Sequence, residues 1–158
     1  MKEFAGKAES QELRIGVVVS RFNEMITEGL LAGALNTLKE AGVTDEAITL
    51  VRVPGSFEIP LAAQRLAQTG NFEGIVCLGA VIRGETPHFD YICLQASSGI
   101  SQVALKYDLP VTFGIITADT VEQALDRADV EGRNKGSEAA TSAVEMANLM
   151  KDLEANGK

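Results

Sequence analysis

The sequence predicts an α/β fold, a single three-layer α/β/α domain built on a mainly four-stranded parallel sheet. Apolar runs of strand length recur along the 158 residues, and stretches with the apolar spacing of amphipathic helices separate them. The apolar runs are nearly continuous rather than alternating, which is typical of strands covered on both faces. We therefore expect helices on both sides of the sheet and one domain over residues 1–158.

The predicted strands are short runs of apolar residues, rich in valine and isoleucine. They cover Ile15–Ser20, Ile48–Val53, Gly74–Ala80 and Val111–Thr117. Because helical patterns fill the intervals, each connection is long enough to cross over and begin another parallel strand.

Five helices are expected around these strands. The first runs from about Glu24 to Ala41, with its leucines on one face and Gly42 closing it. The others run from near Glu58 to Gln68, from Pro87 to before Pro110, from a capping box of Thr120 and Gln123 to about Ala128, and from near Lys135 to Leu153. Residues 1–12 fit no element. They are predicted to be either a frayed tail or an arm that adds an edge strand to a neighbouring subunit.

Composition and charge exclude several classes of partner. Hydrophobic residues make up 46% of the chain and charged residues 23%, which is ordinary for a globular protein. The net charge of −8 disfavours nucleic acids and anionic membranes, which both need a basic face. An anionic substrate would therefore need local positive groups that act against the charge of the whole protein.

The two cysteines, Cys77 and Cys93, form no C-x-x-C pair, and there is only one histidine, so no metal site is predicted. Both cysteines are interpreted as small buried hydrophobic residues. The polar stretch from Met1 to Gln11 does not resemble a secretory leader, and no apolar run approaches the roughly 20 residues of a membrane span. We expect a cytoplasmic protein.

Polar and aromatic side chains follow the predicted strands at the ends where parallel sheets bind ligands. Ser20–Asn23 follows the first strand, Pro54–Glu58 the second, the loop before His88 the third, and Thr117–Asp119 the fourth. Each segment alone is weak evidence. Their convergence at one edge of the sheet predicts a binding site.

His88 is the only histidine, and it follows Thr86-Pro87, a helix-start signal. The backbone N–H groups of Glu85 and Thr86 lie beside it, where a helix N-terminus favours an anion. The sequence therefore indicates a proton-transferring imidazole next to an anion site. The alternative is an exposed helix-start histidine without a task.

Other candidate residues also have structural alternatives. Phe22 either stacks on a flat heterocycle or staples onto the following helix. Ser56 and Glu58 either bind a polyol or cap a helix. Arg127 and Lys135 flank a glycine-bearing turn, where they either reach a site on this subunit or the next, or remain solvated.

These motifs together resemble the 6,7-dimethyl-8-ribityllumazine synthase family from about Arg14 to Leu153, in the family's order. They are Ser20–Asn23, Val53–Pro60, Gly79–Tyr91, Phe113-Gly114, Thr117–Thr120, Arg127 and Asn134–Gly136. The resemblance implies the penultimate step of riboflavin biosynthesis, in which 5-amino-6-(D-ribitylamino)uracil condenses with 3,4-dihydroxy-2-butanone 4-phosphate. The products are the lumazine, phosphate and water. The resemblance implies no metal and no organic cofactor.

The resemblance also implies a role for each site residue. His88 would transfer protons. The phosphate would be held by the backbone of Glu85 and Thr86 and by the side chain of Arg127. The ribitylaminouracil would contact Phe22, Ser56, Phe57, Glu58, Ala80, Val81, Ile82, Phe113 and Lys135. In the family, Phe113 and Arg127 come from the adjacent subunit.

Family members form pentamers, and many close these into icosahedral shells, while an insertion before the last helix is associated with smaller assemblies. The segment from Arg127 to Lys135 contains no recognisable insertion, so we expect a shell, with riboflavin synthase as a potential partner. Two alternatives are a flavodoxin-like flavin carrier, whose layers would be similar, and a structural shell protein with a vestigial site. The intact set of site residues argues against the second.

Overall fold

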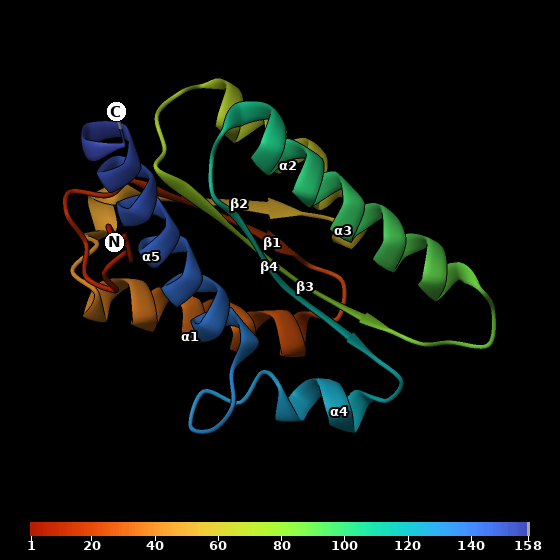
Figure 1. Ribbon diagram of the computed structural model, residues 1–158. Helices are drawn as coiled ribbons and strands as arrows, with labels where there is room; N and C mark the ends of the chain where they lie inside the picture. The colour runs from red at the N-terminus through yellow and green to blue at the C-terminus, as the bar shows by residue number, and fades with distance from the viewer. Residues whose placement is uncertain (158) are drawn as a thin grey trace.

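A four-stranded parallel sheet forms the centre of the computed structural model, which describes residues 1–157 (Figure 1). The strands lie in the order β2-β1-β3-β4. Their bounds are β1 Ile15–Ser20, β2 Ile48–Val53, β3 Gly74–Ile82 and β4 Val111–Ala118. β1 and β2 match the prediction, whereas β3 and β4 are longer because they continue to pair with each other as far as Ile82 and Ala118.

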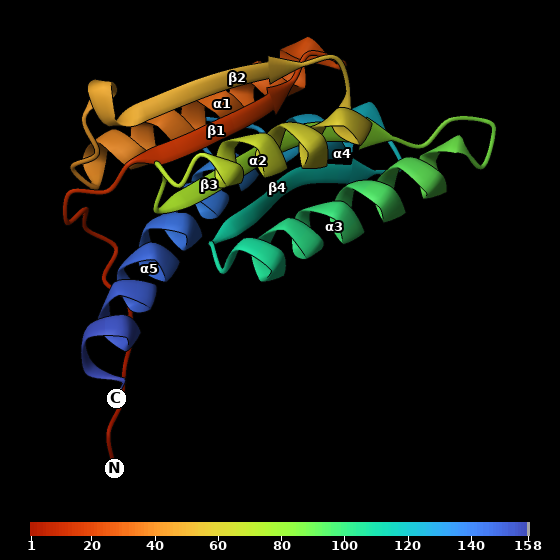
Figure 2. The same ribbon diagram turned by 90° about the horizontal axis from the view of Figure 1, so that it is seen from above.

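Helices cover both faces of the sheet, as predicted (Figures 1 and 2). The helices α1 (Glu24–Glu40), α4 (Val121–Asp126) and α5 (Lys135–Asn156) contribute to the core on one face, and α2 (Ile59–Gln68) and α3 (His88–Tyr107) to the core on the other. Short 3₁₀ turns lie at Asp45–Ala47 and Ser56–Glu58. The three-layer α/β/α architecture expected from the sequence is confirmed.

Side chains of the central strand alternate between the two cores. Val17 and Val19 pack in the core with α1 and α5, whereas Val18 packs in the core with α2 and α3. This alternation follows from the two-residue period of a strand, and it explains why a strand buried on both faces is apolar throughout.

Local capping signals placed two helix starts correctly. The Thr120 hydroxyl accepts a hydrogen bond from the Gln123 N–H at 3.2 Å, as the predicted capping box requires. At α3, Pro87 lies just outside the helix, and the Thr86 hydroxyl is 3.5 Å from the His88 N–H. That contact is at the limit of a hydrogen bond, and the N-cap position is held by Pro87, so the predicted capping role of Thr86 is wrong.

The first residues of the chain lie along α5 of the same chain. The Asn148 side-chain amide donates to the carbonyls of Lys7 and Glu9, both at 2.7 Å, and the Ser10 N–H donates to Ala41 at 2.6 Å. The expectation of a frayed tail is therefore wrong. Pairing of this arm with a neighbouring subunit stays a prediction.

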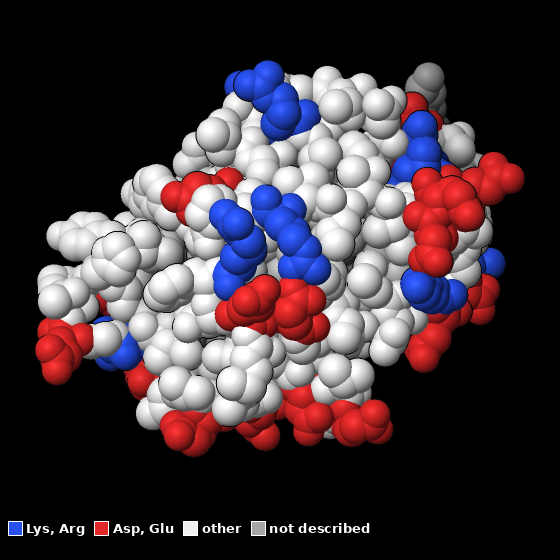
Figure 3. Space-filling model, turned by 180° about the vertical axis from the view of Figure 1, so that it is seen from behind, with Lys and Arg blue, Asp and Glu red and all other residues white. Residues whose placement is uncertain are grey.

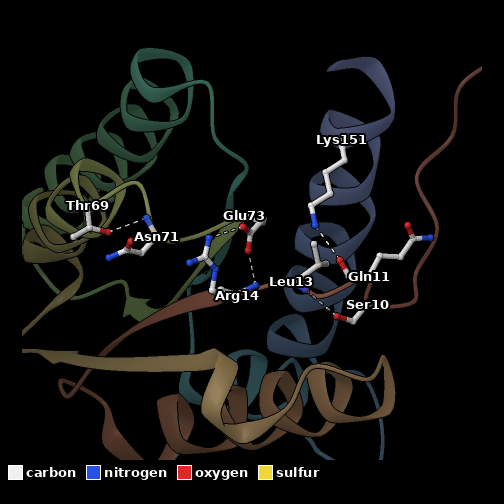
Figure 4. A network of polar contacts seen from close by, with 8 residues as sticks. All are labelled: Ser10, Gln11, Leu13, Arg14, Thr69, Asn71, Glu73 and Lys151. Atoms are coloured by element: carbon white, nitrogen blue, oxygen red, sulfur yellow. Dashed lines mark hydrogen bonds and ion pairs between the residues drawn. The ribbon is translucent and has the colours of Figure 1, made fainter. Parts of the chain in front are cut away.

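The end of the sheet where β1 and β3 begin, the amino edge, is closed by a polar network (Figure 4). Glu73 accepts from the Arg14 backbone N–H at 2.6 Å and from its guanidinium at 2.9 Å, and the Glu73 N–H donates back to the Arg14 carbonyl. Lys151 of α5 donates to the Gln11 carbonyl at 2.9 Å. Sequence reasoning did not identify this network.

Among the residues that the structure describes, no helix has both the length and the apolar character that crossing a membrane requires.

Candidate functional site

A pocket of about 710 Å³ lies at the opposite end of the sheet, the carboxyl edge. It is lined by the segments that follow β1 and β2, by the end of β3 and by the start of α3. The strand order is β2-β1-β3-β4, so the chain passes from β1 to β2 on one side of β1 and then crosses to β3 on the other side of β1. The pocket is thus at the topological switch point, where open parallel sheets bind ligands.

The pocket brings together most of the predicted site residues. Those that line it are Phe22, Ser56, Phe57, Glu58, Ala80, Val81, Ile82, Thr86 and His88.

Phe22 projects from the turn between β1 and α1. Its backbone N–H donates to Pro54 at 3.0 Å, which ties the turn to the end of β2. The next residue, Asn23, is left-handed with φ 61°, and its side-chain amide donates to the Ala80 carbonyl at 3.0 Å. This turn leaves Phe22 72% exposed, so the hydrophobic-staple alternative is wrong. Its ring is available as a stacking surface at the pocket.

Glu58 and Ser56 differ in how their polar atoms are used. The Glu58 carboxylate accepts a hydrogen bond from the Gly55 N–H at 3.0 Å. One of its two oxygens therefore has the capping role that the structural alternative predicted. Ser56 is only 5% exposed, and its hydroxyl has no hydrogen-bond partner within the described chain. A buried hydroxyl without a partner is costly, so a group that enters the pocket and bonds to Ser56 would recover that energy.

Ser20, at the end of β1, was not identified as a site residue from the sequence, and its hydroxyl is also buried without a partner. Both hydroxyls surround Gly79 of β3. A Cβ at Gly79 would lie 2.5 Å from the Ser56 hydroxyl and 3.1 Å from that of Ser20. Glycine at this position therefore leaves room for the two hydroxyls. Of the two serines, only Ser56 lines the pocket.

The last residues of β3 expose part of their backbone to the pocket. The pairing of β1 with β3 ends at Val19 and Leu78, whereas β3 continues to Ile82 along β4. Beyond Leu78 the side of β3 that faces β1 is therefore free of strand partners, apart from the bond of Asn23 to the Ala80 carbonyl. Peptide groups in this position can pair with the polar edge of a ring, as a neighbouring strand would.

His88 is the first residue of α3, and the exposed segment Gly84–His88 leads into it. Gly84 and Thr86 line the pocket, but Glu85 between them does not. The N-terminus of a 20-residue helix and free backbone N–H groups favour an anion here. The residues that line the pocket include no lysine or arginine.

Three predicted site residues lie elsewhere on the chain. Phe113 of β4, 43% exposed, and Lys135 of α5 line a separate hollow of about 260 Å³ between these elements. The Lys135 N–H donates to the Arg127 carbonyl at 2.8 Å, so Arg127 is beside them. The Arg127 guanidinium donates to the Gln123 carbonyl at 3.0 Å, and Lys135 is paired with Glu138.

The predicted site residues therefore fall into separate groups on the chain. We call the residues of the pocket the loop half-site, and Phe113, Arg127 and Lys135 the β4 half-site. The sequence predicted the members of both groups, but it left open to which group Lys135 belongs; its place beside Phe113 assigns it to the β4 half-site.

The cysteines are not part of either group. Burial raises the pKa of the Cys77 thiol. Cys93 is half-buried rather than buried as predicted, and partial burial together with the nearby negative charge of Asp90 raises its pKa as well. Neither thiol is therefore activated as a thiolate nucleophile.

The surface is negatively charged on balance, in agreement with the net charge of −8. Acidic side chains follow the lower and right-hand margins of the face seen in Figure 3. Basic side chains on this face occur in small groups. A phosphate-bearing ligand would be repelled at long range and would need a dedicated cation at its site.

The sequence matches the model of a known protein family. The family model described as 6,7-dimethyl-8-ribityllumazine synthase matches residues 12–151. This range starts just before β1, extends through most of α5 and contains every residue of both half-sites.

Proposed function

This chain belongs to the 6,7-dimethyl-8-ribityllumazine synthase family, and it is thereby a transferase-type enzyme of riboflavin biosynthesis. We propose that it catalyses the penultimate step of that pathway, in which 5-amino-6-(D-ribitylamino)uracil and 3,4-dihydroxy-2-butanone 4-phosphate form 6,7-dimethyl-8-ribityllumazine, phosphate and water. The observation that supports this most directly is the chemistry of the two half-sites, since each contains groups that the other lacks.

The loop half-site suits the ribitylaminouracil. The exposed ring of Phe22 stacks on the pyrimidinedione, and the backbone of Val81 and Ile82 meets the polar edge of that ring. The unpartnered Ser56 hydroxyl and the Glu58 carboxylate bond to hydroxyls of the ribityl chain. This assignment gives the Ser56 hydroxyl the partner that it lacks within the described chain.

The butanone phosphate binds with its phosphate at the N-terminus of α3. The N–H groups of Glu85 and Thr86 hold the anion there. A phosphate ester also needs a cation, and no lysine or arginine lines the pocket. In the proposal Arg127 of a neighbouring copy supplies it, since a guanidinium donates to phosphate oxygens in pairs.

The reaction needs several proton transfers. The free amine of the uracil condenses with the ketone and releases one water. Phosphate then leaves with the electrons of its C–O bond, and proton shifts convert the neighbouring hydroxyl-bearing carbon into a carbonyl. The ribityl-bearing amine closes the ring on that carbonyl with loss of a second water. The imidazole of His88 can accept and return protons near neutral pH. Because an amine and a ketone react readily by themselves, positioning supplies more of the rate than acid–base catalysis does.

The active site is complete only between two copies of the chain. Phe113, Arg127 and Lys135 of one copy close the loop half-site of the next, which requires a head-to-tail interface and favours a closed ring. Exposed apolar side chains on α3 and β4, including Leu94, Leu105 and Phe113, agree with burial between copies. We propose pentamers, assembled into an icosahedral shell. The single domain, the cytoplasmic location and contact with riboflavin synthase stay predictions of the sequence.

The first test is to follow lumazine absorbance with both substrates present. We expect product only when both are added, and no product from the pair would contradict the proposed reaction.

Shared sites are tested by coexpressing His88→Ala and Arg127→Ala chains. An intact site needs the loop half-site of an Arg127→Ala chain and the β4 half-site of a His88→Ala chain. At equal expression about a quarter of the interfaces combine the two. Assayed at low butanone phosphate, the mixture should therefore exceed either variant alone. Activity no higher than the mean of the two variants would instead place the whole site within one chain.

A further inference from the structure

Arg83 is the residue after the end of β3, and its side chain lies outside the pocket. Its guanidinium donates to the Asp119 carboxylate at 2.8 Å, and it is 3.5 Å from that of Asp90. It also lies over the ring of Phe89, 4.3 Å from the ring centre. Its backbone N–H donates to the Ala118 carbonyl at 2.9 Å, one step beyond the last paired residues of the sheet.

These contacts enclose the segment Gly84–His88 from both ends. Arg83 immediately precedes the segment, and Phe89 and Asp90 immediately follow it. Asp119 directly follows β4, so its ion pair with Arg83 connects both ends of the segment to the sheet. The contacts of one guanidinium therefore hold the entrance and the exit of the segment that contains Thr86 and His88.

The segment itself has little else to hold it. All of its residues are exposed, and a Cβ at Gly84 would meet nothing within 4 Å. The contact between the Thr86 hydroxyl and the His88 N–H, at 3.5 Å, is weak. A loop with so few contacts loses conformational entropy when it orders around a ligand, unless its ends are already held in place.

Arg83 is not available as the cation for the phosphate. Its charge is shared between two carboxylates, and the hydrogen bond to Asp119 raises its pKa above the ordinary value. It can therefore affect the reaction only through the segment that it holds.

We propose that Arg83 is a positioning residue, which holds Gly84–His88 in the conformation that binds the phosphate of the substrate and directs His88 into the pocket. The inference rests on the proposed function, because it takes the phosphate site from that proposal. It adds Arg83 and Asp119 to the residues on which binding of the phosphorylated substrate depends.

If Arg83 has this positioning role, its substitution should change the KM for the butanone phosphate but not the stability of the whole protein. The side chains of Arg83, Asp90 and Asp119 are 46%, 62% and 66% exposed, and ion pairs this exposed stabilise a protein little. Arg83→Met should raise KM for the butanone phosphate about 10-fold, change KM for the ribitylaminouracil less than about 2-fold and leave the unfolding midpoint unchanged. Arg14→Met, which removes an arginine–carboxylate pair at the amino edge, is the matched control and should change neither KM.

Asp119→Asn distinguishes positioning from direct contact with the phosphate. If Arg83 positions the segment, Asp119→Asn raises KM for the butanone phosphate as well, and the double variant is no worse than Arg83→Met alone, because both remove one interaction. If Asp119→Asn lowers that KM, the freed guanidinium binds phosphate directly and the inference is overturned. An Arg83→Met enzyme kinetically equal to Arg14→Met also overturns it.

A proteolysis measurement separates this inference from the proposed function. Cleavage after Glu85 by a glutamate-specific protease, located by mass spectrometry, reports the mobility of the segment in inactive and active protein alike. We expect faster cleavage at Glu85 in Arg83→Met than in the wild type and in Arg14→Met, and equal rates contradict the positioning role. If the wild type forms no lumazine but Arg83→Met is still cleaved faster at Glu85, only the proposed reaction is contradicted.

Discussion

The two edges of the sheet are built from the same strands, yet their polar groups are treated differently. At the amino edge, Arg14 and Glu73 satisfy each other through backbone and side-chain bonds. At the carboxyl edge, Ser20 and Ser56 keep buried hydroxyls without a partner, and the ring of Phe22 is exposed. The polar groups of Arg14 and Glu73 are thus satisfied within one chain, whereas the carboxyl edge has donors, acceptors and apolar surface left for a ligand.

The remaining unpartnered buried atom in the described chain does not change this comparison. It is the side-chain oxygen of Asn148, whose amide nitrogen already makes two hydrogen bonds to the N-terminal arm. The comparison predicts that substitutions of the proposed ligand-binding side chains reduce activity without unfolding the protein. Substitution of Glu73 at the amino edge should instead lower stability slightly and leave activity unchanged.

The largest effect is expected for Arg127→Ala. Removing the proposed phosphate cation should raise KM for the butanone phosphate about 100-fold, since a charge-assisted pair with phosphate is lost. KM for the ribitylaminouracil should change far less. Steady-state kinetics with each substrate varied in turn provide the measurement, and Arg14→Ala at the amino edge is the control. Equal changes for both substrates would argue against the phosphate role.

A somewhat smaller effect is expected for His88→Ala. Turnover should fall about 10- to 100-fold, because positioning of the two substrates supplies most of the rate. The measurement is kcat at saturating substrates, with circular dichroism to check the fold. Complete loss of activity in a folded variant would show that proton transfer matters more than proposed.

Gly79→Ala tests whether the floor beneath Ser56, around Gly79 of β3, is packed as closely as its geometry indicates. The added methyl group would collide with the Ser56 hydroxyl, and overpacking of this kind costs about 1–3 kcal/mol in the free energy of unfolding. Gly84→Ala is the matched control, because nothing lies within 4 Å of its Cβ position. Urea unfolding of both variants measures the difference, and similar stabilities would mean that the floor can relax.

The smallest effect is expected at the amino edge and depends on pH. Partial burial raises the pKa of the Glu73 carboxyl, but the hydrogen bonds from Arg14 outweigh it, so the pKa lies below its ordinary value of 4.5. A carboxyl whose pKa is lowered in the folded state stabilises the protein at pH values above its ordinary pKa. This contribution disappears as the pH falls through the lowered pKa.

Glu73→Gln should therefore reduce the free energy of unfolding by no more than about 1 kcal/mol at pH 7, and the difference from the wild type should shrink at a second pH well below the ordinary pKa of 4.5. Urea unfolding at the two pH values provides the measurement, and kcat and KM should not change. Asp45→Asn, which removes a more exposed pair with Lys39, is the control. A difference that grows toward low pH would contradict the sign.

Much of the fold could be predicted because its signals are local. The apolar runs located all four strands, and the ends of β1 and β2 agreed to the residue. The Thr120–Gln123 capping box located the start of α4, since a cap depends on residues only three apart. The members of both half-sites were also named from sequence, through motifs that follow strand ends and through the family resemblance.

Other features could not be predicted, because they depend on residues far apart in the chain. The partners Arg14 and Glu73 are separated by 59 positions, and Arg83 and Asp119 by 36. The exposure of Phe22 depends on how the turn at Asn23 meets β3. No periodicity encodes such pairs.

The sequence by itself determined the layers, the parallel strands and the edge of the sheet that has the candidate pocket. The reason is that burial on two faces and helix capping both depend on residues that are close together in the chain. Only the tertiary structure decided that Lys135 lies beside Phe113, away from the pocket that contains Phe22 and His88. The reason is geometric. The sheet and its helices set the distance between two surface groups, and a list of residue types contains no such distance.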